Sequence, residues 1–236
     1  MNLSEYRQFT DSLLASLSRD PRVVGVVALG SMAEQGRLPD QWSDHDFFVI
    51  VRPGEQASFR ANRDWLPDAE SIALFFQETA HGCKAVYDSG HLIEFAIFDP
   101  DEISLARVNA YRVLLDRGGV AERMAEVAAR TEPRSSDDWL IGQMLTSLLV
   151  ALLRARRGET MSARSMLRSA VRHFAALMPH SDNLDPLRRF EISHPELAAR
   201  VERAMRLDAK AAALGLLDLF AERVPDQRAI AAIRRV

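Results

Sequence analysis

The first half of the chain alternates between short apolar runs and polar breaks. Two of the clearest runs are Val23–Leu29 and His45–Val51, and residues common in turns lie at their ends. Short apolar runs bounded by Gly, Pro, Asp or Ser are typical of β-strands. The same pattern predicts four further strands, at Ser71–Gln77, Cys83–Tyr87, Leu92–Phe98 and Arg112–Leu115.

Apolar residues at helical spacing precede these strands, interrupt them and then replace them. A helix is expected at Leu3–Leu17, and shorter ones at Phe59–Trp65, after Pro100 and at Val120–Arg130. Beyond the polar segment 131–136 the strand pattern is absent, and helices are predicted at 137–157, 162–178, 195–206, 209–223 and 227–235. The chain is therefore predicted to have an α+β fold, with a mixed β-sheet and flanking helices in residues 1–132 and an all-α helical-bundle domain in residues 133–236.

Composition and charge narrow the class of protein. The single cysteine, Cys83, excludes an internal disulfide and favours a reducing compartment, and no secretion signal is visible, so a cytoplasmic protein is expected. The longest apolar run, Met144–Leu153, is short and contains two hydroxyl residues, so no membrane is expected as a partner. The net charge of −3 divides into −8 over residues 1–133 and +5 over 134–236, which does not favour nucleic acid as a partner.

The segment between the first two strands, residues 30–46, carries the most informative chemistry. Gly30 and Ser31 follow the first strand, and Asp44 and Asp46 open the second. Because alternate residues of a strand share a face, the two carboxylates are expected to project together, where they repel each other unless a cation lies between them. Mg²⁺ commonly binds one or two carboxylates together with substrate phosphates. A Gly-Ser turn lets backbone N–H groups and a small hydroxyl approach a phosphate closely.

This arrangement resembles the motif of the nucleotidyltransferase superfamily, which is a glycine-serine pair, a loop and aspartate-x-aspartate on the next strand. In this chain it is Gly30-Ser31-x-Ala33-x-x-Gly36 followed by Ser43-Asp44-His45-Asp46. The two-part layout is similar to that of the antibiotic nucleotidyltransferases acting on aminoglycosides or lincosamides. In those proteins a helical domain follows the catalytic domain and helps to form the acceptor pocket. Neither GxxxxGK[ST] nor GxGxxG occurs, which disfavours a P-loop or Rossmann enzyme.

The resemblance implies a third carboxylate, and Glu94, a lone charge in the apolar strand His91–Phe98, is the candidate. Glu94 is either the third metal ligand beside Asp44 and Asp46 or the general base on the acceptor hydroxyl; the alternative is an edge-strand glutamate facing water. Gly30 and Ser31 are expected to hold the distal phosphates. The implied reaction is Mg²⁺-dependent transfer of a nucleoside monophosphate from an NTP, expected to be ATP, to a hydroxyl of a small-molecule acceptor, with release of pyrophosphate. Several such enzymes are dimers, so a homodimer is also expected.

Two other functions and several secondary candidates stay open. The acceptor could be a protein hydroxyl, as in nucleotidyltransferase-type antitoxins, or the chain could be a catalytically inactive nucleotide-binding regulatory module; the retention of all three acids argues against the latter. Trp42 is either a residue that stacks on a base or part of a packed loop. Arg164, Arg168 and Arg172 form either a phosphate-binding stripe or a solvated helix face. His45 is expected to point away from the two aspartates.

Overall fold

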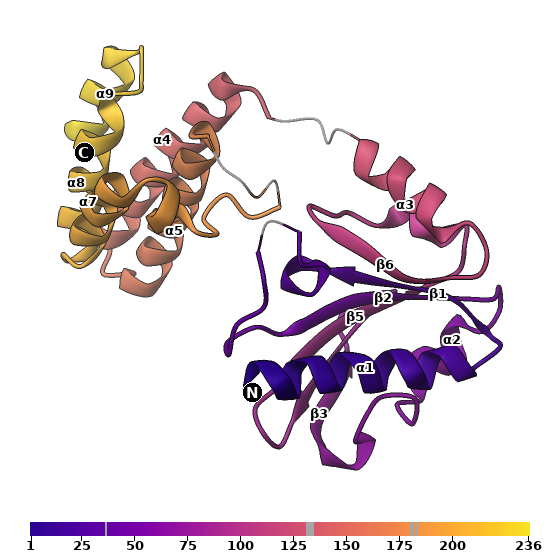
Figure 1. The fold of residues 1–236 in the computed structure, drawn as a ribbon. Helices are drawn as coiled ribbons and strands as arrows, with labels where there is room; N and C mark the ends of the chain where they lie inside the picture. The colour runs from indigo at the N-terminus through magenta and orange to yellow at the C-terminus, as the bar shows by residue number, and fades with distance from the viewer. Residues whose placement is uncertain (36, 131–134, 180–181, 183) are drawn as a thin grey trace. The chain divides into compact units, whose positions relative to one another are not determined.

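The computed structural model describes residues 1–236 except 36, 131–134, 180–181 and 183 (Figure 1). The chain divides into two compact units, Met1–Thr131 and Glu132–Val236. The first combines helices with a β-sheet and the second is helical, so the fold class is α+β. Gly36 of the motif and most of the predicted boundary segment lie outside the described residues.

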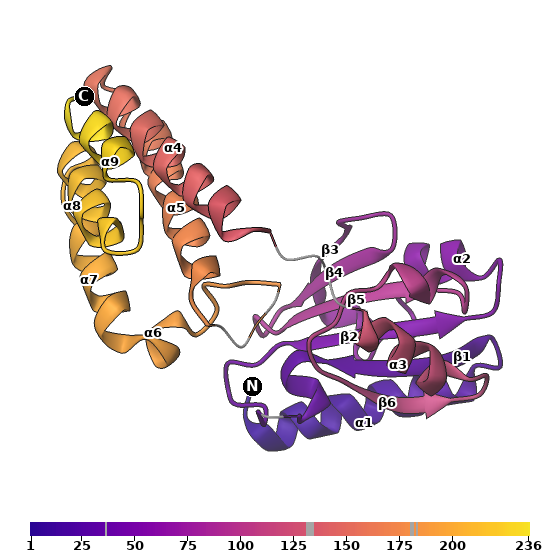
Figure 2. The same cartoon turned by 90° about the horizontal axis from the view of Figure 1, so that it is seen from above.

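Within the described residues, the first unit contains a six-stranded mixed sheet in the order β3-β4-β5-β2-β1-β6 (Figure 2). Strands β2 and β5 are parallel, and the other neighbouring strands are antiparallel. All six predicted strands are present, with each end within one residue of its expected position. They are β1 (Val23–Leu29), β2 (His45–Val51), β3 (Ile72–Gln77), β4 (Gly82–Tyr87), β5 (Leu92–Phe98) and β6 (Tyr111–Asp116).

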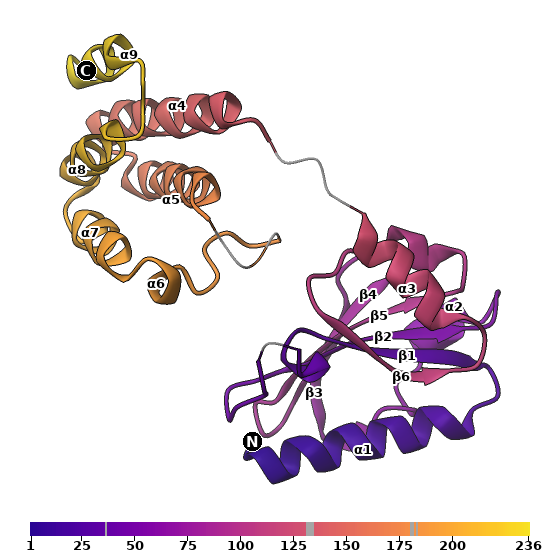
Figure 3. The same ribbon diagram turned by 45° about the horizontal axis from the view of Figure 1, so that its top comes forward.

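Helices cover the two faces of this sheet, with α1 (Leu3–Arg19) and α3 (Val120–Ala129) on opposite sides (Figure 3). Asn2 and Glu5 form a capping box that fixes the start of α1. The buried face of α1 joins one core with side chains such as Phe47 and Phe95, while the core under α3 includes Phe48. Neighbouring residues of β2 therefore belong to different cores, as the alternation of a strand requires.

Two local predictions need correction, and one short helix was missed. The helix α2 spans Gln56–Ala61 rather than Phe59–Trp65, because the chain turns extended at Asn62, whose carbonyl accepts a hydrogen bond from the Trp65 indole at 2.8 Å. After Pro100 there is only one 3₁₀ turn, η3 (Glu102–Leu105), and not an α-helix. Helix α6 (Phe190–Ser193) was not predicted, since four residues are too few for an apolar period.

The second unit is built on a long helical hairpin. Ser136 caps α4 through a hydrogen bond from the Trp139 N–H, and Gly158, at φ +76°, turns the chain into α5. Phe174 and Phe220 stack at 4.0 Å between ring centroids in the core. The helices are α4 (Asp137–Arg156), α5 (Thr160–Leu177), α6, α7 (Pro195–Met205), α8 (Ala209–Ala221) and α9 (Gln227–Arg234).

Among the described residues, α4 is the one helix long and apolar enough to cross a membrane. Several of its apolar residues pack inside the helical unit. Leu140, Met144, Leu148 and Leu152 are buried there. A core helix of a globular domain passes the same length and composition test, and in α4 33% of the apolar window is buried within the unit.

The arginine stripe on α5 has structural partners. Arg164 donates hydrogen bonds to the carbonyls of Met205 and Leu207, at 2.7 and 2.6 Å, and so caps the end of α7. Arg172 forms an ion pair with Asp185 at 3.0 Å. Arg164 thus ties α5 to the end of α7, whereas Arg172 is half exposed beside Asp185 and remains on a largely solvated face.

Candidate functional site

Asp46 and Glu94 are neighbours across the one parallel strand pair in the described sheet. The register of β2 and β5 places Asp46 directly opposite Glu94, and Phe47 opposite Phe95. Residues opposite each other in a sheet project from the same face. Glu94 therefore lies in the middle of the sheet beside Asp46, and the alternative of an edge-strand glutamate is wrong for this fold.

Aromatic side chains on the reverse face fix this register. The rings of Phe47 and Phe95 stack with centroids 5.4 Å apart and planes at 12°. A slip of one strand by one residue would turn its carboxylate toward the buried core and its aromatic ring toward the opposite face. The position of the acidic pair is thus set by packing on the side of the sheet that faces α1.

The Gly-Ser turn lies next to Asp46. Gly30 begins a 3₁₀ turn, η1 (Gly30–Ala33), with φ at +51°, a conformation that glycine adopts without steric cost. A Cβ atom placed on Gly30 would lie 3.8 Å from Oδ2 of Asp46. The end of β1 thus brings the backbone of the turn alongside the carboxylate, as the sequence predicted. Ser31, the next residue, is almost fully buried.

Tyr6 of α1 joins these elements, and sequence reasoning missed it. Its hydroxyl donates a hydrogen bond to the Asp44 carbonyl at 3.0 Å and also makes a hydrogen bond with the Ser31 side chain. The pKa of Tyr6 is raised to about 12, mainly by burial; the Ser31 hydrogen bond lowers it, and the charges of Asp44 and Asp46 contribute to the rise. Tyr6 is therefore a neutral hydroxyl that ties the turn to the aspartate segment. The sequence signal that could have identified Tyr6 is its position among the apolar residues on the buried face of α1.

Asp44 lies one residue before β2 and is partly exposed, as Asp46 is. The loop leading to it is ordered by Asp40, which accepts hydrogen bonds from the Ser43 hydroxyl at 3.1 Å and the Trp42 backbone N–H at 2.9 Å. The Trp42 side chain is 85% exposed, so the packed-loop interpretation is wrong.

Lys84 is a further residue that the sequence did not reveal. The antiparallel register of β4 and β5 places it opposite Glu94, and its ammonium lies 3.1 Å from Oε1 of Glu94 and 3.0 Å from Oε1 of Glu78. The two carboxylates raise the pKa of Lys84 through hydrogen bonds, Glu78 first. The register thus places three charged residues in one row across β4, β5 and β2, namely Lys84, Glu94 and Asp46. Within this row the ammonium of Lys84 already pairs with the carboxylate of Glu94.

The donor set suits a hard cation, although it is not a closed cage. Among the described residues, no three His, Cys, Asp or Glu side chains lie together as a ready metal site. Mg²⁺ does not need such a cage, because it retains waters and takes further oxygen ligands from substrate phosphates. The partly exposed carboxylates of Asp44 and Asp46, next to a turn that can approach phosphate, fit that mode of binding.

On the reverse face of β2, His45 is fully buried in a hydrogen-bonded chain. Its Nε2 lies 2.8 Å from the Thr10 hydroxyl, and its Nδ1 lies 2.8 Å from Nε2 of His91. Since Thr10 donates its own hydrogen to the Tyr6 carbonyl, it accepts one from Nε2 of His45. Nδ1 of His45 must then accept from His91. His45 points away from the aspartates, as expected, and links α1, β2 and the residue preceding β5.

This chain of hydrogen bonds predicts a loss of stability in acid. Burial, followed by the nearby His91, lowers the pKa of His45 to about 3; for His91, burial and the positive amino terminus lower the pKa, while Asp44 raises it. The unfolded chain binds more protons between the ordinary histidine pKa near 6.5 and about pH 3, so the free energy of unfolding falls as the pH drops through this range. We expect a loss of about 3 kcal/mol between pH 6.5 and pH 4, measured by urea unfolding at several pH values.

The matched variant for this prediction is His45→Gln, whose amide can keep a donor and an acceptor but does not titrate. Its pH dependence should be clearly shallower than that of the wild type. Equal slopes in the two proteins would mean that other groups cause the acid sensitivity.

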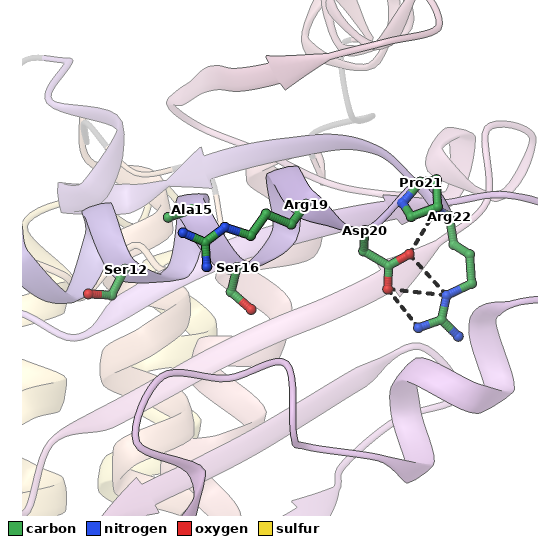
Figure 4. Close-up of a pocket in the computed structure, with 7 residues that line it drawn as sticks. All are labelled: Ser12, Ala15, Ser16, Arg19, Asp20, Pro21 and Arg22. Atoms are coloured by element: carbon green, nitrogen blue, oxygen red, sulfur yellow. Dashed lines mark hydrogen bonds and ion pairs between the residues drawn. The ribbon is translucent and has the colours of Figure 1, made fainter.

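A surface hollow of about 820 Å³ lies away from this site (Figure 4). It is lined by the second half of α1 and the turn into β1. Tyr6 marks the end of α1 next to the candidate site, and Arg19 lies about 20 Å along the helix from it, at a rise of about 1.5 Å per residue. Two of its three charged groups, Asp20 and Arg22, form an ion pair with each other at 2.6 Å. The hollow therefore does not add to the candidate site.

Comparison with known proteins gives similarities to solved structures but none to a known sequence. No protein-family model and no curated protein matches the sequence. Among solved structures, the chain matches the crystal structure of an aminoglycoside 6-adenyltransferase from Bacillus subtilis, with 13% identity and a TM-score of 0.33 over 96% of this chain and 90% of that one. A TM-score at this level does not assign a function to this chain.

Proposed function

We propose that this chain is a Mg²⁺-dependent nucleotidyltransferase that moves a nucleoside monophosphate from an NTP, ATP in the first instance, to a hydroxyl of a small molecule. An aminoglycoside or a lincosamide is the proposed acceptor class, and pyrophosphate is the second product. The observation that carries the proposal is the parallel pairing of Asp46 with Glu94 next to the Gly30–Ser31 turn. This arrangement puts carboxylates, a backbone turn and a hydroxyl-bearing residue in one place.

Each residue has a proposed role. Asp44 and Asp46 would hold Mg²⁺, which, when bound, neutralises the triphosphate and stabilises the attacking and leaving oxygens. The backbone at Gly30 and the hydroxyl of Ser31 would orient the distal phosphates, with Tyr6 fixing the Ser31 side chain. Positioning and electrostatics contribute most of the rate in such reactions, so these few groups suffice.

For Glu94 we favour the role of general base over that of third metal ligand. Lys84 already contacts one of its oxygens at 3.1 Å, and an ammonium at that distance opposes the approach of a second cation. The other oxygen would accept the proton of the acceptor hydroxyl while that hydroxyl oxygen bonds to the α-phosphorus and the bond to pyrophosphate breaks.

We propose that the helical unit binds the acceptor. It contains a hollow of about 470 Å³ lined by apolar side chains of α5, α6 and α7, among them Val171, Phe190 and Val201. Glu191, Glu202 and Arg206 also line this hollow, and Arg206 pairs with Glu202 at 3.2 Å. The carboxylate of Glu191 is the group there that would suit a cationic acceptor such as an aminoglycoside.

The test is pyrophosphate release from each of the four NTPs with Mg²⁺, across a panel of aminoglycosides and lincosamides, with nucleotide binding measured in parallel by calorimetry. An acceptor-dependent signal that is absent in Asp46→Asn would support the proposal and identify both substrates. Silence with intact Mg²⁺-dependent nucleotide binding would redirect the search to protein hydroxyls. No nucleotide binding by the folded wild type would refute the proposal.

Lys84→Met should separate the role of Lys84 in the site from any role in stability. We expect kcat to fall about tenfold, because Glu94 loses the partner that orients it, with KM for the nucleotide little changed. Stability should change by less than about 1 kcal/mol, since the lysine lies near the surface. Lys84→Arg should restore part of kcat, whereas equal losses in both variants would argue against a charge-based role.

A further inference from the structure

The two edges of the described sheet differ in chemistry. Edge strand β6 carries Arg112, which pairs with Glu34 at 2.9 Å, and Asp116, which accepts hydrogen bonds from backbone N–H groups of the following turn. Edge strand β3 reads Ile-Ala-Leu-Phe-Phe-Gln and contains neither a charge nor a proline. Proteins usually protect an open edge with such residues, because unpaired backbone groups recruit other strands. The edge at β3 lacks that protection (Figure 2).

The side chains of β3 add an apolar surface to this open edge. Leu74 and Phe76, which lie on the same face of the strand, are 51% and 42% exposed. The pairing with β4 is regular over Leu74–Gln77, and its one irregularity lies between Ile72 and Leu74. The edge thus keeps a regular backbone next to two large exposed apolar side chains.

We propose that β3 pairs antiparallel with β3 of a second copy of this chain, around a twofold axis at Phe75, so that the two sheets become one. Antiparallel pairing of a strand with its own copy is the isologous contact that a symmetric dimer requires. With the axis at Phe75, Leu74 lies opposite Phe76 of the partner subunit, and the reverse pair forms on the other side of the axis. The two exposed side chains of each copy then cover those of the other.

Charge and the matching of apolar side chains together favour this register over its neighbours. With the axis at Leu74, the irregular end of β3 moves to the centre, and Glu78 approaches Glu70 of the partner subunit at both ends, where like charges repel. With the axis at Phe76, Glu78 lies against the apolar Leu74 of the partner subunit. With the axis at Phe75, the uncharged residues Ala73–Gln77 pair with one another and the two most exposed apolar side chains cover each other. Glu78 then lies opposite Ile72 of the partner subunit, at the end of the paired segment.

The proposed dimer has a consequence for the candidate site without depending on the reaction. Phe76 lies opposite Lys84, and Lys84 opposite Glu94, so the apolar edge and the acidic pair share one face of the sheet. A twofold axis perpendicular to the sheet keeps that face common to both copies, and both candidate sites would then open on the same side of the joined sheet.

The first experiment is sedimentation equilibrium of the full-length chain. We expect a mass of twice the 26.4 kDa of the single chain, and Leu74→Lys should weaken the dimer at least tenfold. The matched control is Leu105→Lys, which changes another exposed leucine of the same unit and should leave the dimer intact. A wild type that stays monomeric at about 100 µM, or a dimer indifferent to Leu74→Lys, would overturn the proposal.

The register is tested by oxidation in a Cys83→Ala background. The double variant Leu74→Cys, Phe76→Cys should form a covalent dimer, because the two positions face each other across the axis. Leu74→Cys alone should not, and a crosslink in that single variant would overturn the register. Amide hydrogen exchange of the wild type provides a readout that needs no variant. Protection of Ile72–Gln77 should rise with protein concentration, and concentration-independent exchange at the edge would contradict pairing between copies.

Discussion

Replacing Asp46 with asparagine is expected to lower kcat for nucleotidyl transfer by about a thousandfold. The substitution keeps the shape of the side chain and removes one of the charges proposed to bind Mg²⁺. In the structure Asp46 is partly exposed at the start of β2, and Glu94 is its register neighbour. A neutral amide there would bind the metal-triphosphate complex weakly and stabilise less of the charge that develops at the α-phosphate. Single-turnover kinetics at saturating nucleotide would measure the effect on the chemical step.

The control for this variant is Asp88→Asn, which changes an exposed aspartate in the turn between β4 and β5. Its activity should stay within about twofold of the wild type, as expected for a surface charge away from the reaction. Thermal unfolding should show both variants folded. An Asp46→Asn protein with near-normal kcat would remove Asp46 from the metal site and with it the main support for the proposed reaction.

The largest effect on stability is expected at His45. Substitution by alanine should lower the free energy of unfolding of the first unit by about 4 kcal/mol, through a cavity and through the loss of two buried hydrogen bonds. Thr10 loses its donor and His91 its acceptor, in a region where Tyr6 stacks on the His45 ring at 3.8 Å. Urea unfolding followed by circular dichroism would measure the change.

His45→Gln separates the hydrogen bonds from the volume of the ring. The glutamine can donate to Thr10 and accept from His91, so it should recover roughly half of the lost stability at pH 7. If alanine and glutamine were equally destabilising, the ring packing alone would explain the effect. If His45→Ala cost less than about 1 kcal/mol, the hydrogen-bonded chain would have no structural role.

The strands were predictable because each is a local pattern. His45–Val51 alternates between two buried faces, and its bounds in the structure match the sequence prediction. The failures lie where a local signal marks the start of an element but not its length. Pro100, Asp101 and Glu102 favour a helix start, and Asp99 and Glu102 do form a reciprocal cap, but the chain is extended again at Ala106 after a single 3₁₀ turn.

The candidate site was predictable only in part, for a related reason. Gly30, Ser31, Asp44 and Asp46 are close in sequence, so their proximity followed from two strands and a loop. That Lys84 contacts Glu94 depends on the register of β4 against β5, which no local pattern specifies. The role of Tyr6 was equally hard to predict. Its hydrogen bond to Asp44 joins residues 38 positions apart and forms only when α1 packs against the sheet.

The parallel pair β2–β5 also has a consequence for the order in which the candidate site forms during synthesis. Parallel strands need a long crossover connection, and here β3 and β4 lie within it. Asp46 therefore gains its neighbour Glu94 only after a further 48 residues have been synthesised. Closing such a loop is slow compared with forming a helix or a hairpin. A nascent chain that ends before β5 already holds the Gly-Ser turn and both aspartates but lacks Glu94. The candidate site should therefore be complete only late in synthesis, and its completion would report the formation of the central sheet rather than the folding of the motif.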